Sequence, residues 1–391
     1  MLTINLSGRI DANNAGIVEE EISSQLAKFP NETPVFDAEN LSYISSAGLR
    51  VLLKAGKKYS EKLNVINASD DVYNIFEVTG FTELFNVRKK FREISVEGCP
   101  VIGEGFSAVV YRLDSDTVAK VFSKFSLTLD AIMAGQKSAR EAFIRGIPTA
   151  ITYDVVRVGK YFGVVYEMAG AETLAETVKK NPARLGELSE KAGRLLREIH
   201  SVEFEPGTFP DAVEIWRKGV ETVYEHDAIS LNERDMLNKI LDRLPVRNTF
   251  IHNDYHPNNI MLQGDELMLI DIADAALGYP AIDFSSLHFL AIEIAPMMKR
   301  TGRSVEEVIG LPDDMLHGFW YGILRGYFGT DDGAKLQDYT RALGDYSVMR
   351  AVMSVAKRVN EPNFERIKMG MSPFIARIPE VFDRFKPIEG I

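Results

Sequence analysis

The sequence predicts two domains of different class, a small α/β domain followed by a larger α+β domain whose C-terminal part is helical. Three observations support this prediction. Strand-like and helix-like apolar patterns alternate over about the first ninety residues. Short apolar strands punctuated by glycine then occupy residues 101–122, and apolar residues recur at helical spacing from residue 284 onward. We therefore place the domains at residues 1–94 and 95–391.

The whole chain has an acidic and otherwise ordinary globular composition. Its 391 residues carry a formal net charge of −11, which argues against nucleic acid or an anionic membrane as the main partner and leaves a cationic substrate open. The single cysteine, Cys99, cannot form an intrachain disulfide and fits a reducing compartment. We find no secretion signal at the start and no apolar run close to the ~18 residues of a membrane-spanning helix. These features predict a soluble, cytoplasmic protein.

Strands and helices alternate in the first domain. Leu2, Ile4 and Leu6 alternate with polar residues and predict a half-buried strand, and the apolar stripe over residues 18–29 predicts a helix. The basic cluster at residues 88–90 is expected to be a solvated link to the second domain. Further strands are expected at 33–37 and 65–66, and further helices from the serines at 45–46 and over 72–76.

Residues 44–49, Ile-Ser-Ser-Ala-Gly-Leu, form a predicted strand–loop–helix segment. On this segment the first domain, over roughly residues 1–90, resembles the STAS domain of anti-sigma-factor antagonists and sulphate transporter tails. In the antagonists, a partner kinase phosphorylates the serine that matches Ser46, and this breaks a protein–protein contact. The resemblance therefore implies a protein partner and a phosphorylation site at Ser46, where about two negative charges would be added at a helix N-terminus. The other interpretation is that Ser45 or Ser46 simply caps the helix, and Ser45 departs from the aspartate that the family often has there.

A glycine-containing hairpin and a lysine within a strand open the second domain. In residues 101–111, Gly103 and Gly105 would let a backbone turn approach phosphates closely, although a lone Gly-x-Gly is more often a tight turn. Lys120 lies in an apolar strand, where an unpaired ammonium is costly to bury. We expect Lys120 to pair with a phosphate and with Glu141 of the next helix. The alternatives are a lysine on an edge strand and an exposed helix charge.

Acidic and amide side chains recur at ordered intervals in residues 252–260, His-Asn-Asp-Tyr-His-Pro-Asn-Asn-Ile. Asp254 and Asn259 are five apart across a short loop, and Asp271 ends the apolar strand that follows. A phosphoryl-transfer site needs one carboxylate to accept the proton of the attacking hydroxyl, and an amide oxygen with a second carboxylate to hold Mg²⁺ on the phosphates. The spacing also matches the catalytic loop and metal aspartate of kinases. The sequence has no His-x-x-x-His pair or cysteine cluster that would point to a metal hydrolase.

This loop, together with Gly-Tyr-Pro-Ala-Ile-Asp at residues 278–283, resembles the aminoglycoside phosphotransferase and choline kinase branch of the kinase-like proteins. The resemblance covers roughly residues 95–391 and is strongest at 101–120 and 250–284. It implies a two-lobed, protein-kinase-like fold. The lobes would be a nucleotide lobe at 95–167 and a catalytic and substrate lobe at 168–391.

The resemblance assigns a role to each candidate residue. The backbone of Glu167 and Met168 would bond the adenine of ATP, where the apolar strand at 162–166 ends. The other implied residues are the catalytic base Asp254, the loop brace His252, the Mg²⁺ ligands Asn259 and Asp271, the nucleotide-binding Gly103, Gly105, Lys120 and Glu141, and the loop anchor Asp283.

Residues 284–391 are expected to form helices, and in the resembled family the substrate is gripped between such helices and the catalytic loop. Met297, Trp320 and Tyr321 are expected to lie in the core rather than in a pocket, because their spacing is helical. Asp331 and Asp332 are expected to form a solvated turn or a helix cap.

We therefore expect an ATP- and Mg²⁺-dependent phosphotransferase acting on a hydroxyl of a small molecule, of the amino sugar, alcohol or amine class. The STAS-like domain would be a regulatory or interaction module. One alternative is a protein serine kinase that phosphorylates Ser46 in cis or in trans. Another is a nucleotide-sensing scaffold without catalysis, although the intact base and metal residues argue against it. Neither nucleic acid nor a membrane is expected as a partner.

Overall fold

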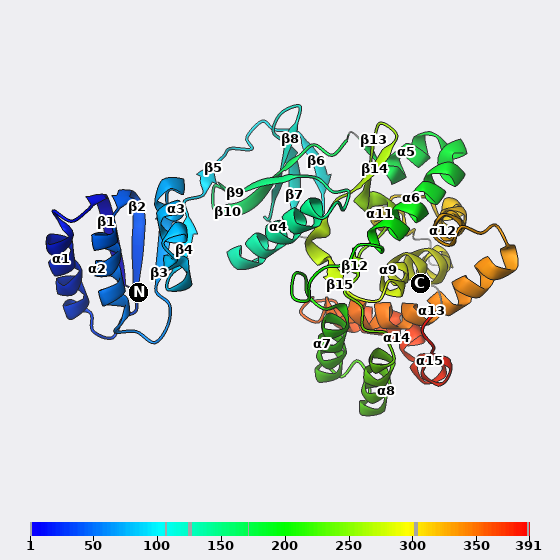
Figure 1. Cartoon of the computed structure of the whole chain (residues 1–391). Helices are drawn as coiled ribbons and strands as arrows, with labels where there is room; N and C mark the ends of the chain where they lie inside the picture. The colour runs from blue at the N-terminus through cyan, green and yellow to red at the C-terminus, as the bar shows by residue number, and fades with distance from the viewer. Residues whose placement is uncertain (1, 106–107, 124–126, 171, 301–303, 389–390) are drawn as a thin grey trace. The chain divides into compact units, whose positions relative to one another are not determined.

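The computed structural model describes residues 2–105, 108–123, 127–170, 172–300, 304–388 and 391. Figure 1 shows the helices and strands and labels most of them. Two hydrophobic cores are present, one in the N-terminal α/β part and a larger one in the remainder. The predicted fold class is confirmed, since an α/β part is followed by an α+β part with a helical C-terminal region. The chain divides into two compact units, residues 1–95 with 155–160 and residues 96–154 with 161–391.

The first unit contains a parallel sheet whose strands are joined by helices. Its strands lie in the order β1-β2-β3-β4, and all the pairings are parallel, which requires crossover connections. Phe36, Leu52 and Phe76 are fully buried in the core of this unit. The elements are β1 Leu2–Ile10, α1 Ala15–Lys28, β2 Pro34–Ile44, α2 Ser46–Gly56, β3 Asn64–Ala68, α3 Asp70–Val78, η1 Phe81–Glu83 and β4 Asn86–Lys89.

The end of the first unit differs from the sequence prediction. The basic cluster at residues 88–90 is not simply a solvated link, because Asn86–Lys89 forms the edge strand β4. The backbone N–H of Lys90 also donates to Ala68 O, at 2.7 Å. The strand contains one apolar residue, Val87, so it shows no alternating pattern that a sequence could reveal.

An antiparallel hairpin system opens the second unit. The sheet order is β5-β9-β10-β8-β7-β6, and the antiparallel β6–β7 pair is the glycine-containing hairpin. Lys120 lies on β8, which is paired with β7 on one side and with β10 on the other. The alternative of an edge-strand lysine is therefore excluded. The elements of this sheet and its helix are β5 Arg92–Glu93, β6 Val101–Glu104, β7 Val109–Arg112, β8 Thr117–Val121, α4 Leu129–Ile144, β9 Thr152–Val158 and β10 Tyr161–Glu167. Of these, β5 and residues 155–158 of β9 belong to the first unit.

The rest of the chain is mainly helical. Short strands and turns interrupt the helices, and they are β11 Glu172–Thr173, η2 Pro182–Arg184, β12 Phe250–Ile251, η3 Pro257–Asn259, β13 Ile260–Gln263, β14 Glu266–Leu269, η4 Ile272–Asp274 and β15 Ala276–Leu277. The helices are α5 Leu174–Lys180, α6 Leu185–Ile199, α7 Ala212–Glu225, α8 Leu231–Asp242, α9 Ala281–His288, the π-helical η5 Phe289–Ile294, α10 Ala295–Arg300, α11 Glu306–Ile309, α12 Asp313–Phe328, α13 Gly333–Ala356, α14 Phe364–Ile375 and α15 Ile378–Arg384.

Helices α6 and α12 pack backbone against backbone. A Cβ added to Gly193 on α6 would lie 2.2 Å from a backbone oxygen of α12, and one added to Gly326 on α12 would lie 2.0 Å from a backbone oxygen of α6. The contact requires glycine at both positions, since real Cβ atoms do not approach so closely. It fixes α6, whose carbonyl at Ala192 accepts a 2.7 Å hydrogen bond from Tyr255 Oη in the predicted catalytic loop.

Two predictions about the helical region are confirmed. Trp320 is fully buried, and Met297 and Tyr321 are partly buried against the same core. Asp332 caps α13, since its side chain accepts a 2.9 Å hydrogen bond from Ala334 N.

One helical run differs from the prediction that no apolar run approaches the length of a membrane-spanning helix. Ala281–Lys299 spans 19 residues with a mean hydropathy of 1.2, which meets the length and composition of a membrane-spanning helix. However, 67% of it is buried inside the structure, as in the core helix of a globular domain. This run is therefore weak support for a membrane span.

Candidate active site

The strand lysine and the predicted metal carboxylate meet directly. Lys120 Nζ lies 2.7 Å from Asp271 Oδ1, and the lysine side chain is 19% exposed. Burial alone would raise the pKa of Asp271, but the charge of Lys120 and its hydrogen bond outweigh this and hold the pKa below its usual value. Asp271 has a left-handed backbone, with φ +61°, which is strained for a residue with a side chain. A cation and a carboxylate that are 151 residues apart in the chain thus share one site.

Glu141, in contrast, is not the partner of Lys120. It lies on α4, and in the described residues no hydrogen bond or ion pair joins it to the lysine. The helix instead packs near the turn that follows Asp271, where a Cβ on Gly135 would lie 3.8 Å from Ala273 Cβ. In this structure the ammonium is thus neutralised by Asp271.

The catalytic loop is held by a buried carboxylate. Asp283 is 1% exposed, and its Oδ2 accepts from His252 N at 2.7 Å while its Oδ1 accepts from Asn253 N. His200 Nε2 lies 3.0 Å from Asp283 Oδ2 and completes the set. Asn253 also has a left-handed backbone, with φ +62°, so the loop needs such an anchor. The predicted anchoring role of Asp283 is confirmed by this geometry.

His252 joins the catalytic loop to the strand that leads to Asp271. The ring is fully buried, and Nε2 lies 3.0 Å from Ile270 O, so this nitrogen carries the proton and donates it. The predicted hydrogen bond from His252 to the backbone is therefore present. It fixes the distance between the loop and the carboxylate of Asp271.

Asp254 projects from this loop into a set of donors. Its Oδ1 accepts from Arg350 Nη2 at 3.1 Å and from Ser286 Oγ at 3.2 Å. His256 Nε2 lies 3.5 Å from Oδ2. Burial would raise the pKa of Asp254, but the hydrogen bond and charge of His256 and the charge of Arg350 outweigh it, so the pKa lies well below its ordinary value. The side chain is therefore an ionised acceptor, as a catalytic base must be.

Asn259 is oriented by the same loop. Its Nδ2 donates to Asp254 O at 3.0 Å, and it lies 3.2 Å from His256 Nε2. Because the amide nitrogen donates to Asp254 O, the oxygen Oδ1 faces the other way, and the described residues offer it no hydrogen-bond donor. A free amide oxygen is a suitable ligand for a hard cation.

The nucleotide side is built more loosely. A Cβ on Gly103 would meet Val110 at 3.6 Å, and one on Gly105 would meet Ala108 O at 3.7 Å, which are ordinary contacts. Neither glycine has a positive φ. The chain itself therefore does not require glycine at either position, and the space that they leave is open to a ligand. The tip of the hairpin, Phe106 and Ser107, lies outside the described residues.

The backbone at the end of β10 is partly used by the protein. Glu167 N donates to Ile151 O at 2.9 Å, and Met168 N donates to Asp116 O at 2.7 Å. These two amides are thus committed, although both residues lie where the resemblance places adenine. The amide of Ala169 has no acceptor in the described part of the chain, so it is the better candidate to donate to an adenine edge.

Sequence reasoning missed Arg350, which comes from α13, 96 residues beyond the base that it contacts. No local spacing connects the two residues. The available signal was the burial of its neighbours Met349, Ala351 and Val352. An arginine in such a stretch needs a partner, but the sequence does not say which one.

The described residues contain no cluster of three or more histidine, cysteine, aspartate or glutamate side chains that could hold a metal. A site made of one amide oxygen and one carboxylate, Asn259 and Asp271, is still adequate for Mg²⁺. This ion keeps several waters and takes the rest of its ligands from substrate phosphates. The residues present therefore fit a nucleotide-borne Mg²⁺ and not a resident structural metal.

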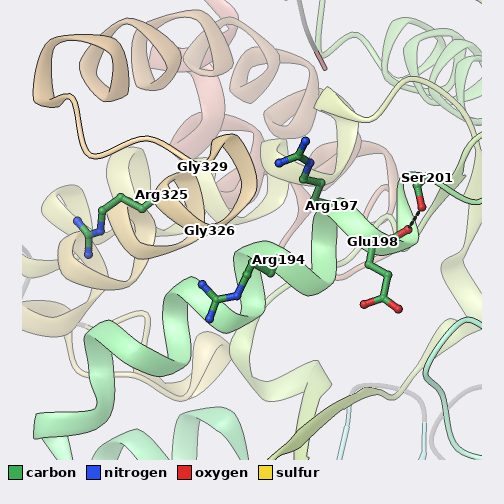
Figure 2. A pocket seen from close by; sticks show the side chains of 7 residues that line it. All are labelled: Arg194, Arg197, Glu198, Ser201, Arg325, Gly326 and Gly329. Carbon is green, nitrogen blue, oxygen red and sulfur yellow. Dashed lines mark hydrogen bonds between the residues drawn. The ribbon is translucent and has the colours of Figure 1, made fainter.

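Two surface cavities, of about 470 and 310 Å³, lie along α6 and α12 and are not lined by the base, the lysine or the metal candidates. Figure 2 shows the larger cavity, where the guanidinium groups of Arg194, Arg197 and Arg325 point in different directions. Arg325 is engaged with Glu190 at 2.9 Å. Arg197 and Arg325 lie in the last turns of their helices, where positive charge offsets the helix dipole. These arginines have a structural explanation.

A strand lysine paired with a carboxylate, beside an anchored loop that carries aspartate and asparagine, defines a kinase-like phosphotransferase. The chain belongs to the phosphotransferase enzyme family, whose profile matches residues 98–303, more than half of the 391. It is therefore an ATP-dependent phosphotransferase, and the resemblance stated from the sequence is confirmed.

Solved structures are also similar to the chain. One is a choline/ethanolamine kinase family protein from Mesorhizobium loti, with 17% identity, a TM-score of 0.45, and coverage of 73% of this chain and 88% of that one. Another is the GDP complex of wild-type aminoglycoside 2'-phosphotransferase-IIIa, with 15% identity, a TM-score of 0.44, and coverage of 80% and 97%. No conclusion about substrate follows from similarity at this level.

The N-terminal part matches a second family. The STAS domain profile covers residues 1–94. BtrV of Bordetella bronchiseptica, a protein named as an anti-sigma factor antagonist, is 36% identical over 90 residues, which are 22% of this chain and 77% of BtrV. The predicted STAS domain is therefore confirmed.

Proposed function

We propose that the protein transfers the γ-phosphoryl group of ATP, in the presence of Mg²⁺, to a hydroxyl of a small molecule. The observation that carries the proposal is the 2.7 Å contact between Lys120 and Asp271, next to the loop that Asp283 holds. A lysine beside a carboxylate is suited to bind the phosphate chain of a nucleotide, because the lysine binds the phosphate oxygens while the carboxylate holds the metal. The class of the acceptor, whether amino sugar, alcohol or amine, is part of the proposal.

In the proposed reaction Asn259 Oδ1 and Asp271 would hold Mg²⁺, which would supply positive charge to the phosphates. Lys120 binds the phosphates from β8, and the hairpin at Gly103 and Gly105 covers them. Asp254 accepts the proton of the acceptor hydroxyl as the O–P bond forms. Because the transition state is loose, most of the rate enhancement comes from positioning and charge, which the anchored loop provides.

The test is ADP formation by the full chain with Mg²⁺-ATP over a panel of amino sugars, polyols and amines, with each product weighed by mass spectrometry. We expect acceptor-dependent ADP release and a product heavier by one phosphoryl group. Removal of Mg²⁺ by chelation should stop the reaction, and Asp271→Ala should lose activity together with the response to Mg²⁺. ATP binding without transfer to any acceptor or to water would favour the scaffold alternative instead.

A second candidate function, phosphorylation of Ser46, is favoured by one observation. Ser45 caps α2, since its Oγ accepts from Ala47 N at 3.2 Å. Ser46 is the first residue of the helix, is exposed, and makes no side-chain hydrogen bond in the described structure. The capping role thus falls to Ser45 and leaves the Ser46 hydroxyl accessible.

Intact-mass measurement separates the two functions. The purified protein is incubated with Mg²⁺-ATP and no other acceptor, alongside Ser46→Ala and Ser45→Ala variants. A gain of one phosphate that Ser46→Ala abolishes, and that Ser45→Ala does not, supports a protein substrate. Unmodified protein that still consumes ATP with a small acceptor supports the first function.

The arrangement of the chain completes the proposal. We assign the regulatory or interaction role to residues 1–94 and catalysis to 95–391, with the nucleotide lobe at 95–167 and the substrate lobe at 168–391. The STAS domain would bind a protein partner, and the enzyme would act in the cytoplasm. A truncated chain that begins at residue 95 should keep phosphotransferase activity if this division is correct.

A further inference from the structure

Helix α13 presents one cation to the catalytic loop and a second to η4, the turn that follows Asp271. Arg350 Nη2 lies 3.1 Å from Asp254 Oδ1, and its Nη1 lies 3.3 Å from Asn253 O. Lys357, the C-cap of the helix, places Nζ 2.9 Å from Asp274 Oδ2. Positions 350 and 357 are seven apart, about two helical turns, so they lie on the same face of α13. That face looks onto the side of the loop that carries the base.

Arg350 has donors to spare. A guanidinium has five N–H donors, and in the described structure two of its contacts go to Asp254 and Asn253. Its side chain is only 15% exposed, yet none of its nitrogens is sealed from solvent without a partner. Its Nε has no partner among the described residues, so at least one donor of this arginine, which contacts the base, is open to solvent. A planar oxyanion would satisfy such donors in a bidentate geometry that water does not reproduce.

The carboxylates around the base are already compensated. Asp254 is paired with Arg350, Asp274 with Lys357, and Asp271 with Lys120. An acceptor that carries an ammonium group needs an uncompensated acid or an open aromatic face. In the described residues of this site each of these acids has a cation of its own, so no unpaired carboxylate is left to hold an ammonium group.

We propose that the acceptor is an alcohol that also carries an oxyanion, a carboxylate or a phosphate monoester, and that Arg350 and Lys357 bind this group. The proposal rests on the phosphotransferase function above and narrows its acceptor to an acidic alcohol over an amine or an amino sugar. In the reaction the acceptor O–H bond breaks, its proton passes to Asp254, the new O–P bond forms and ADP leaves. Arg350 would hold the base and the oxyanion together, which sets the hydroxyl in front of Asp254.

The experiment uses the full chain with Mg²⁺-ATP and four probes of similar skeleton: D-glucose, D-glucosamine, D-gluconate and D-glucose 6-phosphate. The kcat/KM is measured where a probe is phosphorylated, and otherwise its inhibition of ATP hydrolysis is measured. We expect at least one acidic probe to have a kcat/KM about tenfold or more above that of glucose, or to inhibit at a concentration about tenfold or more lower, as a charged hydrogen bond would give. Glucosamine should have a lower kcat/KM than glucose, or should inhibit more weakly. The gluconate and glucose 6-phosphate arms decide between carboxylate and phosphate.

Charge reversal supplies the matched variants. Lys357→Glu should remove the preference for the acidic probe and improve glucosamine, both measured relative to glucose in the same variant. Lys357 is half exposed, so the variant is expected to fold. Arg358→Ala removes the neighbouring cation, whose contact is with Glu361 at 3.8 Å, and should change nothing.

Equal strength of all four probes, or a preference for glucosamine in the wild type, overturns the proposal while the phosphotransferase function stands. A wild-type protein that neither transfers nor hydrolyses ATP overturns that function instead. In that case calorimetric titration of the same probes, with Mg²⁺ and a non-hydrolysable ATP analogue, still decides the charge preference of the site.

Discussion

The residues on the two sides of the Lys120–Asp271 contact differ in how far they are buried. On the catalytic side, Asp283 and His252 are buried and hold the loop by hydrogen bonds of 2.7 and 3.0 Å. On the nucleotide side, Val101 and Ile102 of the glycine-containing hairpin are 54% and 46% exposed. The chain thus fixes the proposed catalytic groups by its own contacts, and it leaves the proposed phosphate cover more exposed. Preorganised charge is what phosphoryl transfer requires, whereas a cover must open for exchange.

The largest effect should come from removing the base on the preorganised side. Asp254→Ala should lower kcat by about 10²–10⁴-fold, because the proton acceptor is lost, and should leave ATP affinity largely unchanged. The measurement is steady-state turnover together with calorimetric ATP binding. Asp265→Ala, which removes an acid from the β13–β14 turn, is the control. Full activity in Asp254→Ala would eliminate the assignment.

A smaller effect should come from loosening the loop without touching the base. Asp283→Asn replaces a carboxylate that accepts from two backbone amides and His200, so we expect a stability loss of about 1–3 kcal/mol. The kcat should fall about tenfold or more because Asp254 is no longer held in place. Chemical denaturation and turnover measure the two effects. An unchanged kcat would show that the loop holds its geometry without this anchor.

A substitution in the glycine-containing hairpin should change the affinity for ATP and little else. Gly103→Ala places a methyl group where the nearest protein atom is 3.6 Å away, so stability should change by less than about 0.5 kcal/mol. The KM for ATP should rise several-fold if the space belongs to phosphate, with kcat little affected. Val101→Ala on the same strand is the control. A Gly103→Ala protein with wild-type KM would show that the hairpin does not touch the nucleotide.

The smallest effect at neutral pH is expected from His288, the buried last residue of α9. Burial, together with the nearby charge of Arg377, lowers the pKa of His288 from its ordinary 6.5 to about 4. Between these values the unfolded chain binds a proton that the native state refuses, so stability should fall as pH drops from about 6.5 to 4. The slope should approach about 1.4 kcal/mol per pH unit, and it should be flat above that range. Denaturation midpoints against pH test this.

A pair of histidine variants controls the pH experiment. His288→Asn should flatten the slope, while His226→Gln, at an exposed position, should leave it unchanged. If the His288→Asn protein still loses stability as the pH falls through this range, another group causes the pH dependence.

Local sequence was sufficient wherever function depends on spacing along the chain. Asp254 and Asn259 lie on one short loop and Asp271 at the end of the next hairpin, so their convergence follows from a few residues. The anchoring role of Asp283 was predicted from its motif and is confirmed. Lys120 was predicted because a charge in an apolar strand needs a partner.

Prediction from sequence failed where a contact depends on packing between segments that are distant in the chain. Lys120 meets Asp271 and not Glu141, and no spacing along the chain connects two residues that are 151 positions apart. Arg350 reaches the loop from a helix that no periodicity connects with it. The strand β4 was not predicted, because it has a single apolar residue, Val87. As an edge strand it needs no alternating pattern.

The left-handed backbone of Asp271 has a consequence for how this enzyme would respond to selection. A glycine at that position would relieve the torsional cost, of the order of 1 kcal/mol, and it would also remove the carboxylate. The same change would leave the ammonium of Lys120, 19% exposed, without its carboxylate, so relief of the backbone strain and loss of the ion pair oppose each other and the melting temperature should move little. A screen for heat tolerance alone should therefore be nearly indifferent between aspartate and glycine, and only a screen that also scores turnover would retain the aspartate.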